Sequence, residues 1–450
     1  MASPGEEWSA DANEVLEISL IVPGDEKPKE IVKFHPKFTY PIFGESETIY
    51  GYKGLKIRLQ FAAHDLTPCL KVTWDKKVKA VGDVEPEDVE GKMKESLPDE
   101  YMTDTEQFDQ RIQNFDYQSF TPPGQLFNTY SLDGKVYEIW QANLLNEACR
   151  EILNNMQSLV LFFIEGASLL DVNDEPWANR RWDVYFLYEK TPESRYTLTG
   201  YATVYRYWHL PSSIATKGKE VTFSPEQIHS NYPDTQPDPL PCRARISQFL
   251  ILPPYQGFGH GGLFYDNLIS HLLSLPLVKE ITVEDPSDAF EDLRNLRDLT
   301  RLRMDGTFTG LHLQALKPPA NSSTPAWPYN AKRIKSKLAP KQFAQCVEME
   351  LLWKLNKNDQ KAYKQYRLLV KARIYKQNKD VMAQLDRLER IDKLEETYRH
   401  VEDDYFRQLE KLETGGPVDN GSGSGSGGDR DGDEDTDDGY GERPKKRVKK

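Results

Sequence analysis

The sequence has few of the features that mark membrane proteins or disulfide-stabilised proteins. Its densest apolar run, residues 159–164, is far shorter than the roughly 18 residues of a membrane-spanning helix. Residues 1–10 contain no basic stretch followed by an apolar one, so we expect no secretory signal. Only four cysteines occur, and no two of them form a C-x-x-C pair. We therefore expect an intracellular protein without a disulfide framework, a zinc site or a membrane partner.

An excess of positive charge is also missing. Asp and Glu number 71 against 58 Lys and Arg, which gives a formal net charge of −13. Residues 415–450 hold nine acidic and seven basic residues, so −11 remains on residues 1–414. An acidic body attracts basic partners and repels nucleic acid. The charge predicts a basic protein partner and no direct contact with nucleic acid, with a simple role in solubility as the alternative.

The patterning of the first part of the chain predicts strands. Leu55, Ile57, Leu59 and Phe61 alternate with polar residues, as in a half-buried strand. At 450 residues the whole chain exceeds the usual size of one hydrophobic core. We therefore expect more than one domain, beginning with a β-rich N-terminal domain over residues 10–125.

Residues 126–320 mix strand and helix patterns, so the fold class expected for the protein is α+β. We expect a helix at 144–163 and strands at 184–188, 198–207 and 243–252. A proline-rich insertion at 210–242 interrupts this region, and a loop of such length is usually functional or flexible.

Residues 321–413 read as a C-terminal helical domain. Apolar residues recur at spacings of three and four from Leu385 to Leu412, which predicts that this stripe packs against other helices. Residues 414–450 form a predicted disordered tail with a glycine/serine repeat and an acidic run. Its end, residues 443–450, is a basic cluster of the nuclear-import kind, with a nonspecific basic tip as the alternative. We expect the protein in both cytoplasm and nucleus.

The most informative segment joins a strand, a glycine-rich turn and a helix. The strand at 244–252 leads into Gln256-Gly257-Phe258-Gly259-His260-Gly261-Gly262, and a helix follows to about residue 274. Backbone N–H groups at a helix start are unpaired and lie at the positive end of the helix dipole, so they bind anions. Glycines allow positive φ and let a phosphate approach closely. The segment therefore predicts a ligand that carries phosphate.

A dinucleotide is one alternative for that ligand. Gly257, Gly259 and Gly262 satisfy G-x-G-x-x-G, and Glu284 follows about twenty residues later. Residues 253–256, however, separate the strand from the first glycine, and the βαβ repetition of a doubly wound sheet is missing. No lysine followed by Ser or Thr completes a nucleotide P-loop.

The turn resembles the Q/R-x-x-G-x-G/A signature of the GNAT acetyltransferase superfamily, with Gln256, Gly259 and Gly261 in the signature places. The resemblance implies a central GNAT fold in which the strand before the turn separates from its neighbour and its freed backbone pairs with the pantetheine arm of acetyl-CoA. A backbone N–H near Leu250 or Ile251 would polarise the thioester carbonyl. The residues expected to hold acetyl-CoA are Phe249, Leu250, Ile251, Gln256, Gly257, Phe258, Gly259, His260, Gly261, Gly262, Ser287 and Arg294. We expect His260 to act as a spacer in the turn rather than as an acid.

Residues 279–285 read as the next strand, which ends in two carboxylates. Side chains alternate along a strand, so Ile281 and Val283 share one face and Glu284 lies on the other. A lysine, whose ordinary pKa is about 10.4, must lose a proton before it attacks a thioester. A carboxylate can accept that proton. A solvated strand end, or a cap for the helix that begins near Ser287, is the alternative explanation of the Glu284-Asp285 pair.

Taken together, the motifs at 247–252, 256–261, 284–287 and 293–294 resemble those of the type B histone acetyltransferase catalytic subunit. The resemblance extends over residues 15–413 and includes segments 43–47, 51–56, 87–92, 163–165 and 203–207. It implies an N-terminal domain, a central acetyltransferase domain and a C-terminal helical domain.

The resemblance also implies roles for individual residues. Glu284 is the expected general base, assisted by Glu165 and Asp285. The histone groove would be lined by Glu45, Ser46, Glu47, Tyr205, Arg206 and Tyr207. Acidic and aromatic residues suit a lysine-bearing peptide, because carboxylates meet its charges and rings pack its alkyl stems. Without the resemblance, Glu45 and Glu47 read as a solvated loop.

The family implies acetyl-CoA as cosubstrate, with no metal, and a lysine of the tail of newly made histone H4, with its dimer partner histone, as substrate. It further implies a WD-repeat β-propeller histone chaperone as partner. Two alternatives remain: a catalytically idle histone-binding chaperone of the same fold, and a small-molecule amine acetyltransferase. The presence of Glu284 and of the intact turn favours the histone acetyltransferase.

Overall fold

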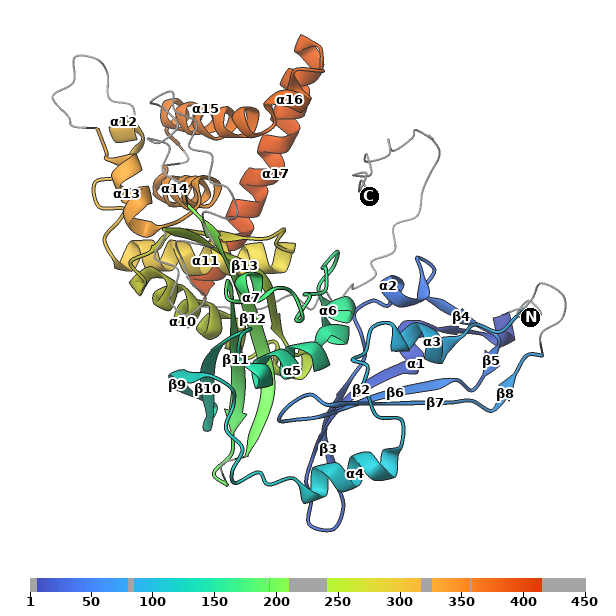
Figure 1. Cartoon of the computed structure of the whole chain (residues 1–450). Helices are drawn as coiled ribbons and strands as arrows, with labels where there is room; N and C mark the ends of the chain where they lie inside the picture. Colours follow the sequence, from blue (N-terminus) through green and yellow to red (C-terminus); the bar gives the residue numbers. More distant parts are fainter. Residues whose placement is uncertain are drawn as a thin grey trace. The chain divides into compact units, whose positions relative to one another are not determined.

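The computed structural model describes residues 6–79, 85–193, 195–209, 241–316, 326–356 and 358–414 (Figure 1). All of these residues belong to one compact unit. The predictions on the 210–242 insertion, apart from its last two residues, and on the tail after 414 fall outside the described residues. Among the described helices, none is both long and apolar enough to span a bilayer.

The first sheet of the chain has four strands in the order β3-β2-β6-β7. Along β6, Ile57, Leu59 and Phe61 are fully buried while Lys56 and Arg58 are exposed, which confirms the predicted alternation. The strands are β2 (Leu16–Val22), β3 (Lys29–Phe34), β6 (Lys56–Ala62) and β7 (Pro68–Thr73).

Short elements surround this sheet, so the region expected to be β-rich also contains helices. The helical ones are η1 (Glu6–Trp8), α1 (Ala12–Val15), α2 (Tyr40–Phe43), α3 (Val89–Lys94) and α4 (Thr105–Asn114). Short strands form two further pairs, β1 (Ser9–Asp11) with β4 (Thr48–Tyr50) and β5 (Tyr52–Lys53) with β8 (Lys76–Lys77).

The central sheet has six strands in the order β14-β13-β12-β11-β10-β9. All neighbours are antiparallel except β13 and β14, which are parallel. The predicted strands at 184–188, 198–207 and 243–252 are confirmed to within a few residues. The strands are β9 (Gln125–Leu132), β10 (Lys135–Asn143), β11 (Trp182–Lys190), β12 (Tyr196–Trp208), β13 (Cys242–Ile251) and β14 (Val278–Val283).

The prediction of one helix over 144–163 is wrong in two respects: helix begins only at Glu147, and it is interrupted. Two helices, α5 (Glu147–Asn155) and α6 (Gln157–Phe163), meet at Met156, and α7 (Pro176–Asn179) follows. Asn146 caps α5, because its side chain accepts a hydrogen bond from the N–H of Cys149 at 3.0 Å. The apolar period alone did not reveal this cap or the break.

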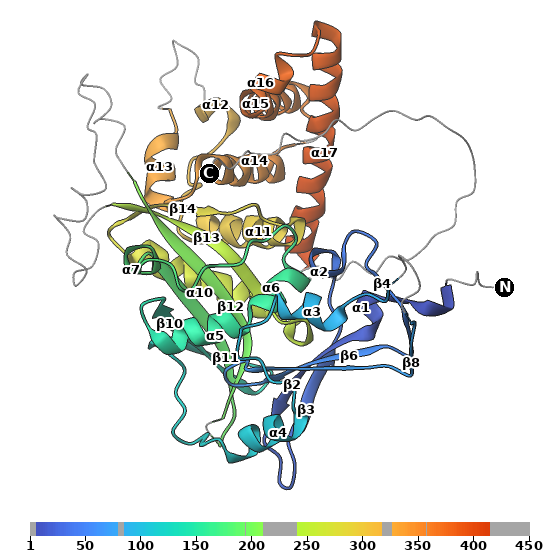
Figure 2. The same cartoon turned by 45° about the vertical axis from the view of Figure 1, so that its right-hand side comes forward.

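Helices dominate the chain after β13. They are α10 (His260–Ser274), α11 (Asp288–Met304), α12 (Leu313–Leu316), α13 (Tyr329–Ser336), α14 (Pro340–Lys354), α15 (Gln360–Gln377), α16 (Lys379–Met382) and α17 (Arg387–Thr414). α10 packs on β13 and β14, and both views show α11 between α10 and α14 (Figures 1 and 2). Helix α11 therefore connects the central sheet to the C-terminal helices.

The apolar stripe of α17 is buried only in its second half. Tyr398, Tyr405 and Leu409 lie in a core with α14 and α15. Leu388 and Ile391 are 73% and 51% exposed, so the expectation that the whole stripe packs is wrong at its start. This long helix extends beyond the surface that its neighbours can cover.

The N-terminal and central sheets share one hydrophobic core. A continuous cluster of buried residues extends from Ala12 to Leu293 and includes strands of both sheets. The backbone N–H of Leu198 on β12 donates to the carbonyl of Ala63 at 2.8 Å, directly after β6. The structure thus has the expected α+β class, while the expected domain boundaries stay predictions.

Candidate active site

Strand β13 has an open edge over its second half. The parallel pairing of β13 with β14 ends at the pair Ile246–Val283. One further hydrogen bond joins the strands, from the N–H of Glu284 to the carbonyl of Ile246 at 2.9 Å. The pairing of β13 with β12 continues to Ile251. Within the described chain, residues 247–251 have no ladder partner on the β14 side. The separation expected of the strand before the turn is therefore present.

The glycine-rich turn connects this edge to α10. Gly257 and Gly259 have φ values of 90° and 89°, which favour glycine, and Gly259 is the N-cap of α10. A Cβ at Gly259 would meet no atom within 4 Å. The side chain of Gln256 donates to the carbonyl of Ile251 at 2.7 Å and fastens the turn to the strand end. The turn therefore leaves space beside the first N–H groups of the helix, at His260, Gly261 and Gly262.

His260 anchors the helix start from inside. It is 4% exposed, and its Nδ1 lies 2.9 Å from the hydroxyl oxygen of Tyr130. Burial lowers the pKa of His260, so the ring is neutral at physiological pH. This position suits the expected spacer role. Phe258, by contrast, is 59% exposed.

The side chains of Phe249, Leu250 and Ile251 pack in the core, so a ligand at this edge would meet their backbone. Phe249 packs between Phe264 of α10 and Phe290 of α11, with ring centroids 5.2 and 4.8 Å away. Leu250 and Ile251 are 5% and 1% exposed. This agrees with a strand that offers main-chain groups along its edge.

Glu284 lies at the point where β14 leaves β13. Its Oε2 accepts a hydrogen bond from the hydroxyl of Ser247 at 2.6 Å, and its Oε1 lies 2.9 Å from Nη2 of Arg245. The side chain remains 40% exposed. The expected alternation is present in part: Ile281 is buried and Val283 packs against the core, but Glu280, on the same face as Glu284, is buried as well. One carboxylate with access to solvent therefore stands at the start of the open edge.

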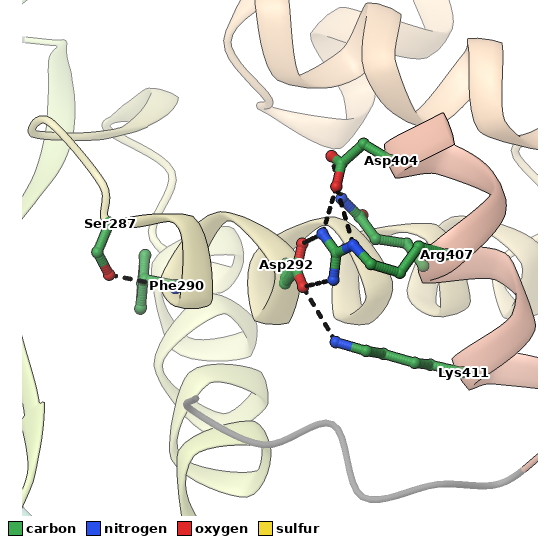
Figure 3. Close-up of polar contacts among 7 residues, drawn as sticks. Ser287, Phe290, Asp292, Asp404, Arg407 and Lys411 are labelled. Atoms are coloured by element: carbon green, nitrogen blue, oxygen red, sulfur yellow. Dashed lines mark hydrogen bonds and ion pairs between the residues drawn. The ribbon is translucent and has the colours of Figure 1, made fainter. Parts of the chain in front are cut away.

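The turn after Glu284 has its own backbone constraint. Asp285 is exposed and has a φ of 28°, a region that Asp and Asn tolerate better than most residues. Ser287 is the N-cap of α11, because its hydroxyl accepts from the N–H of Phe290 at 3.4 Å (Figure 3). The cap is thus a serine, and the Glu284-Asp285 carboxylates are not needed for it.

Comparison with known proteins identifies the family. Residues 8–165 match the family model described as the histone acetyl transferase HAT1 N-terminus. A histone acetyltransferase type B catalytic subunit of Emericella nidulans is 39% identical over 90% of this chain and 89% of its own length. Those of Schizosaccharomyces pombe and Cryptococcus neoformans are 36% and 33% identical, over 90% and 91% of this chain and 94% and 99% of theirs.

The chain belongs to the type B histone acetyltransferase catalytic subunits. This confirms the resemblance seen in the motifs and makes the protein an acetyltransferase with the GNAT fold of its family. The dinucleotide alternative for the glycine turn is thereby set aside.

Two of the expected acetyl-CoA contacts in this acetyltransferase have additional structural roles. Ser287 is the helix cap described above, and Arg294 is only 8% exposed, with its charge near Tyr265 and Cys346. Their contact with acetyl-CoA stays a prediction. Across the ranges described above, no group of three His, Cys, Asp or Glu side chains could hold a metal ion.

The residues expected to line the histone groove of the acetyltransferase differ in exposure and in whether their charges already have partners within the protein. Glu45 and Ser46 are exposed in the turn after α2. The carboxylate of Glu47 points inward and accepts hydrogen bonds from the backbone N–H groups of Tyr40, at 3.0 Å, and Thr39. Burial acts to raise the pKa of Glu47, but these hydrogen bonds hold it below its ordinary value. Glu47 therefore stabilises the start of α2.

Tyr205 and Tyr207 lie near the end of β12 with ring centroids 4.6 Å apart, and Tyr207 is 41% exposed. Arg206 between them forms an ion pair with Asp183, with 3.1 Å between Nε and Oδ2. The ring of Tyr207 is exposed, that of Tyr205 is half-buried against Trp182, and Arg206 is paired with a carboxylate.

Glu165 is exposed in the turn after α6. The backbone N–H of Gly166 donates to the hydroxyl of Tyr40 at 3.2 Å, and the side chain of Gln248 on β13 donates to the carbonyl of Ser168 at 3.1 Å. Through these bonds the loop contacts both α2 and β13. The structure therefore brings the Glu45 turn and the Glu165 turn together around Tyr40.

Helix α11, which follows Glu284, is fastened to the C-terminal helix α17. Asp292 accepts from Nη2 of Arg407 at 2.7 Å and from Nζ of Lys411 at 3.1 Å (Figure 3). Burial acts to raise the pKa of Asp292, but the hydrogen bonds from Arg407 and Lys411 outweigh it and hold that pKa below its ordinary value. The contact therefore stabilises the fold most when Asp292 is ionised.

Asp292→Asn should lower the melting temperature by about 2 °C at pH 7. A carboxylate with a lowered folded-state pKa contributes stability above its unfolded pKa and loses it as pH falls through the folded value. The difference from wild type should therefore shrink toward pH 3, as followed by thermal unfolding. Asp403→Asn, at an exposed aspartate of α17, is the control and should show no such trend. A difference that persists at low pH would assign the loss to packing instead.

Proposed function

We propose that the protein transfers the acetyl group of acetyl-CoA to a lysine in the tail of newly made histone H4, by direct attack in a ternary complex. The observation that carries the proposal is the place of Glu284, directly after β14 and beside the open edge of β13, the strand that leads into the glycine turn. A carboxylate at this point can accept the proton of a lysine amine that attacks an acetyl group bound along the edge.

The described residues fit acetyl-CoA. The N–H groups at the start of α10 suit its pyrophosphate, because the turn leaves room where a side chain at Gly259 would stand. The backbone at 247–251 suits its pantetheine arm, because this edge has no β14 partner. When bound, acetyl-CoA supplies an activated thioester. A backbone N–H near Leu250 or Ile251 would face the carbonyl of that thioester and stabilise negative charge on its oxygen.

Glu284 accepts the proton of the lysine amine in this proposal. The ammonium form has no lone pair, and an ordinary lysine pKa of about 10.4 leaves little neutral amine at pH 7. The 40% exposure of Glu284 lets a peptide side chain or one water reach the carboxylate. Glu165 and Asp285, both exposed, are proposed to assist in removing the proton.

The test of the function is to incubate the full chain with radiolabelled acetyl-CoA and a synthetic H4 tail peptide. Label on the peptide, at lysine, is expected. Binding of the peptide without transfer would instead support an idle histone-binding chaperone, and transfer to polyamines in preference to the peptide would support a small-molecule acetyltransferase.

Glu45→Lys should raise the KM for the H4 peptide by about twofold to fivefold, because it reverses an exposed charge at the proposed groove. The affinity for acetyl-CoA should not change. The effect should shrink in high salt, because salt screens exposed charges. Glu410→Lys makes the same charge change at an exposed position of α17 and is the control. If KM rises equally in both variants, the cause is the change in net charge. Glu45 would then be part of a solvated loop and not of the groove.

We also propose that a WD-repeat β-propeller chaperone delivers the histone and that the basic cluster at 443–450 drives nuclear entry. Deleting residues 415–450 should leave peptide acetylation intact and shift the protein to the cytoplasm. Fluorescence microscopy of tagged full-length and shortened chains measures this. An unchanged nuclear signal would assign import to another segment or to the partner.

A further inference from the structure

We propose that Arg245 and Ser247 are positioning residues that hold the Glu284 carboxylate at the open edge of β13. The inference rests on the proposed function, because it concerns the base assigned there. It assigns a role to two side chains of β13, the strand whose backbone is proposed to contact acetyl-CoA.

Both oxygens of Glu284 are engaged by β13. Arg245 reaches Oε1 at 2.9 Å and Ser247 reaches Oε2 at 2.6 Å. Two contacts to two different oxygens fix the plane of the carboxylate as well as its position. A glutamate that is 40% exposed would otherwise sample several rotamers, and fixing one of them has an entropic cost. The two side chains reduce that freedom before substrate binds.

Ser247 stands at an irregularity of the sheet. Ile246 pairs with Val204 and Gln248 pairs with Thr203, so Ser247 has no partner on β12. The extra residue is a β-bulge, and bulges redirect a side chain while the strand continues. The Thr203 hydroxyl accepts from the N–H of Gln248 at 3.0 Å and stabilises the bulge. The irregularity occurs where β14 departs, which is the place that needs a donor for Glu284.

Arg245 connects the carboxylate to the expected peptide side. Its Nη1 donates to the hydroxyl of Tyr207 at 3.2 Å, and the guanidinium lies 5.7 Å from the centre of that ring. Tyr207 of β12, Arg245 of β13 and Glu284, directly after β14, form one row of contacts. Tyr207 is 41% exposed, so the outer end of this row is open to a peptide.

The charge of Arg245 also suits the reaction. A cation beside the base makes a second cation there unfavourable, so it disfavours the lysine ammonium relative to the neutral amine. Arg245 therefore favours the neutral amine that attack requires.

A second arginine–glutamate pair on the same two strands provides a matched control. Arg243 lies 2.7 Å from Glu280, which is 11% exposed and also contacts Arg333. Arg243 is two residues before Arg245 on β13, and among the described contacts neither Arg243 nor Glu280 touches Glu284. Arg243→Gln removes the same type of charge from the same strand without affecting the proposed base.

The experiment compares Arg245→Gln, Arg245→Lys, Ser247→Ala and Glu284→Gln, each in the full chain, with a double variant of Arg245→Gln and Glu284→Gln. We expect Arg245→Gln to lower kcat by roughly 10-fold to 100-fold, with the KM for acetyl-CoA almost unchanged. Arg245→Lys should recover part of the loss. Ser247→Ala, which removes one hydroxyl, should cost about threefold to tenfold.

The double variant distinguishes positioning from an independent role. If Arg245 acts through Glu284, the double variant should be no slower than Glu284→Gln alone. The loss in Arg245→Gln should appear in kcat and not in the KM for acetyl-CoA, and Arg243→Gln should leave both at their wild-type values.

Losses that multiply in the double variant, or wild-type kcat in both Arg245→Gln and Ser247→Ala, would overturn the inference. If Arg245→Gln does not fold, as judged by thermal unfolding, Ser247→Ala, measured alone and combined with Glu284→Gln, decides the question. Wild-type kcat in Glu284→Gln would contradict the proposed function instead, so the two failures are distinguishable.

Discussion

Replacing Glu284 with glutamine is expected to lower kcat by roughly 10²-fold to 10⁴-fold while the affinity for acetyl-CoA stays almost unchanged. The amide keeps the shape of the side chain, and it can still accept from Arg245 and donate to Ser247, the two partners of the carboxylate. It cannot accept the proton of the lysine ammonium. The variant therefore removes proton transfer and leaves the positioning of the side chain intact.

The pH profile of this variant adds a second measurement. If deprotonation limits the rate, Glu284→Gln should regain activity as pH rises toward the lysine pKa of about 10.4, because solvent then supplies the neutral amine. Glu165→Gln and Asp285→Asn should cost less, and asparagine should tolerate the positive φ of residue 285. Wild-type kcat for Glu284→Gln near neutral pH would falsify the assignment and move the base to Glu165 or Asp285.

Replacing Gly259 with leucine is expected to weaken acetyl-CoA binding by roughly 10-fold to 100-fold, as measured by calorimetry. The N-cap of α10 has a φ of 89°, and a Cβ there would point into space that the protein leaves open. A side chain would occupy the expected place of the pyrophosphate, near the N–H groups that should hold it. Strain at positive φ adds to the effect.

Gly310 allows the two causes to be separated. It has a φ of 76°, and a Cβ there would also meet no atom within 4 Å. Gly310→Leu should therefore impose a similar backbone strain without touching the turn, and acetyl-CoA should bind it as it binds the wild type. Unchanged affinity in Gly259→Leu, or tight binding of a nicotinamide dinucleotide to the wild type, would contradict the acetyl-CoA assignment of the turn.

Local patterns in the sequence were sufficient for much of the fold. The alternation over residues 55–61 predicted a strand with one buried face, and β6 has that face. The glycine turn predicted a strand followed by a helix, and β13 and α10 flank it. Such patterns report the period of an element and the chemistry of a turn, which depend on neighbouring residues.

Long-range contacts explain where the predictions from sequence were wrong or incomplete. The stripe of α17 has a helical period throughout, but Leu388 and Ile391 are exposed because burial depends on what lies opposite. In the same way, Glu47 and Arg206 appeared as acidic and basic groups for a peptide. Their partners, the N–H groups of Thr39 and Tyr40 and the carboxylate of Asp183, became visible only in the fold.

The sequence by itself determined the family, the glycine turn and the carboxylate at the end of the strand that follows, because each is a pattern of residue types within a short segment. Only the tertiary structure decided which side chains hold that carboxylate. The register that sets Arg245 beside Thr282 arises from the pairing of β13 with β14, and the bulge that leaves Ser247 without a partner arises from the pairing of β13 with β12. A shift of one residue would turn each side chain to the other face of the sheet, and nothing in a local pattern fixes that register.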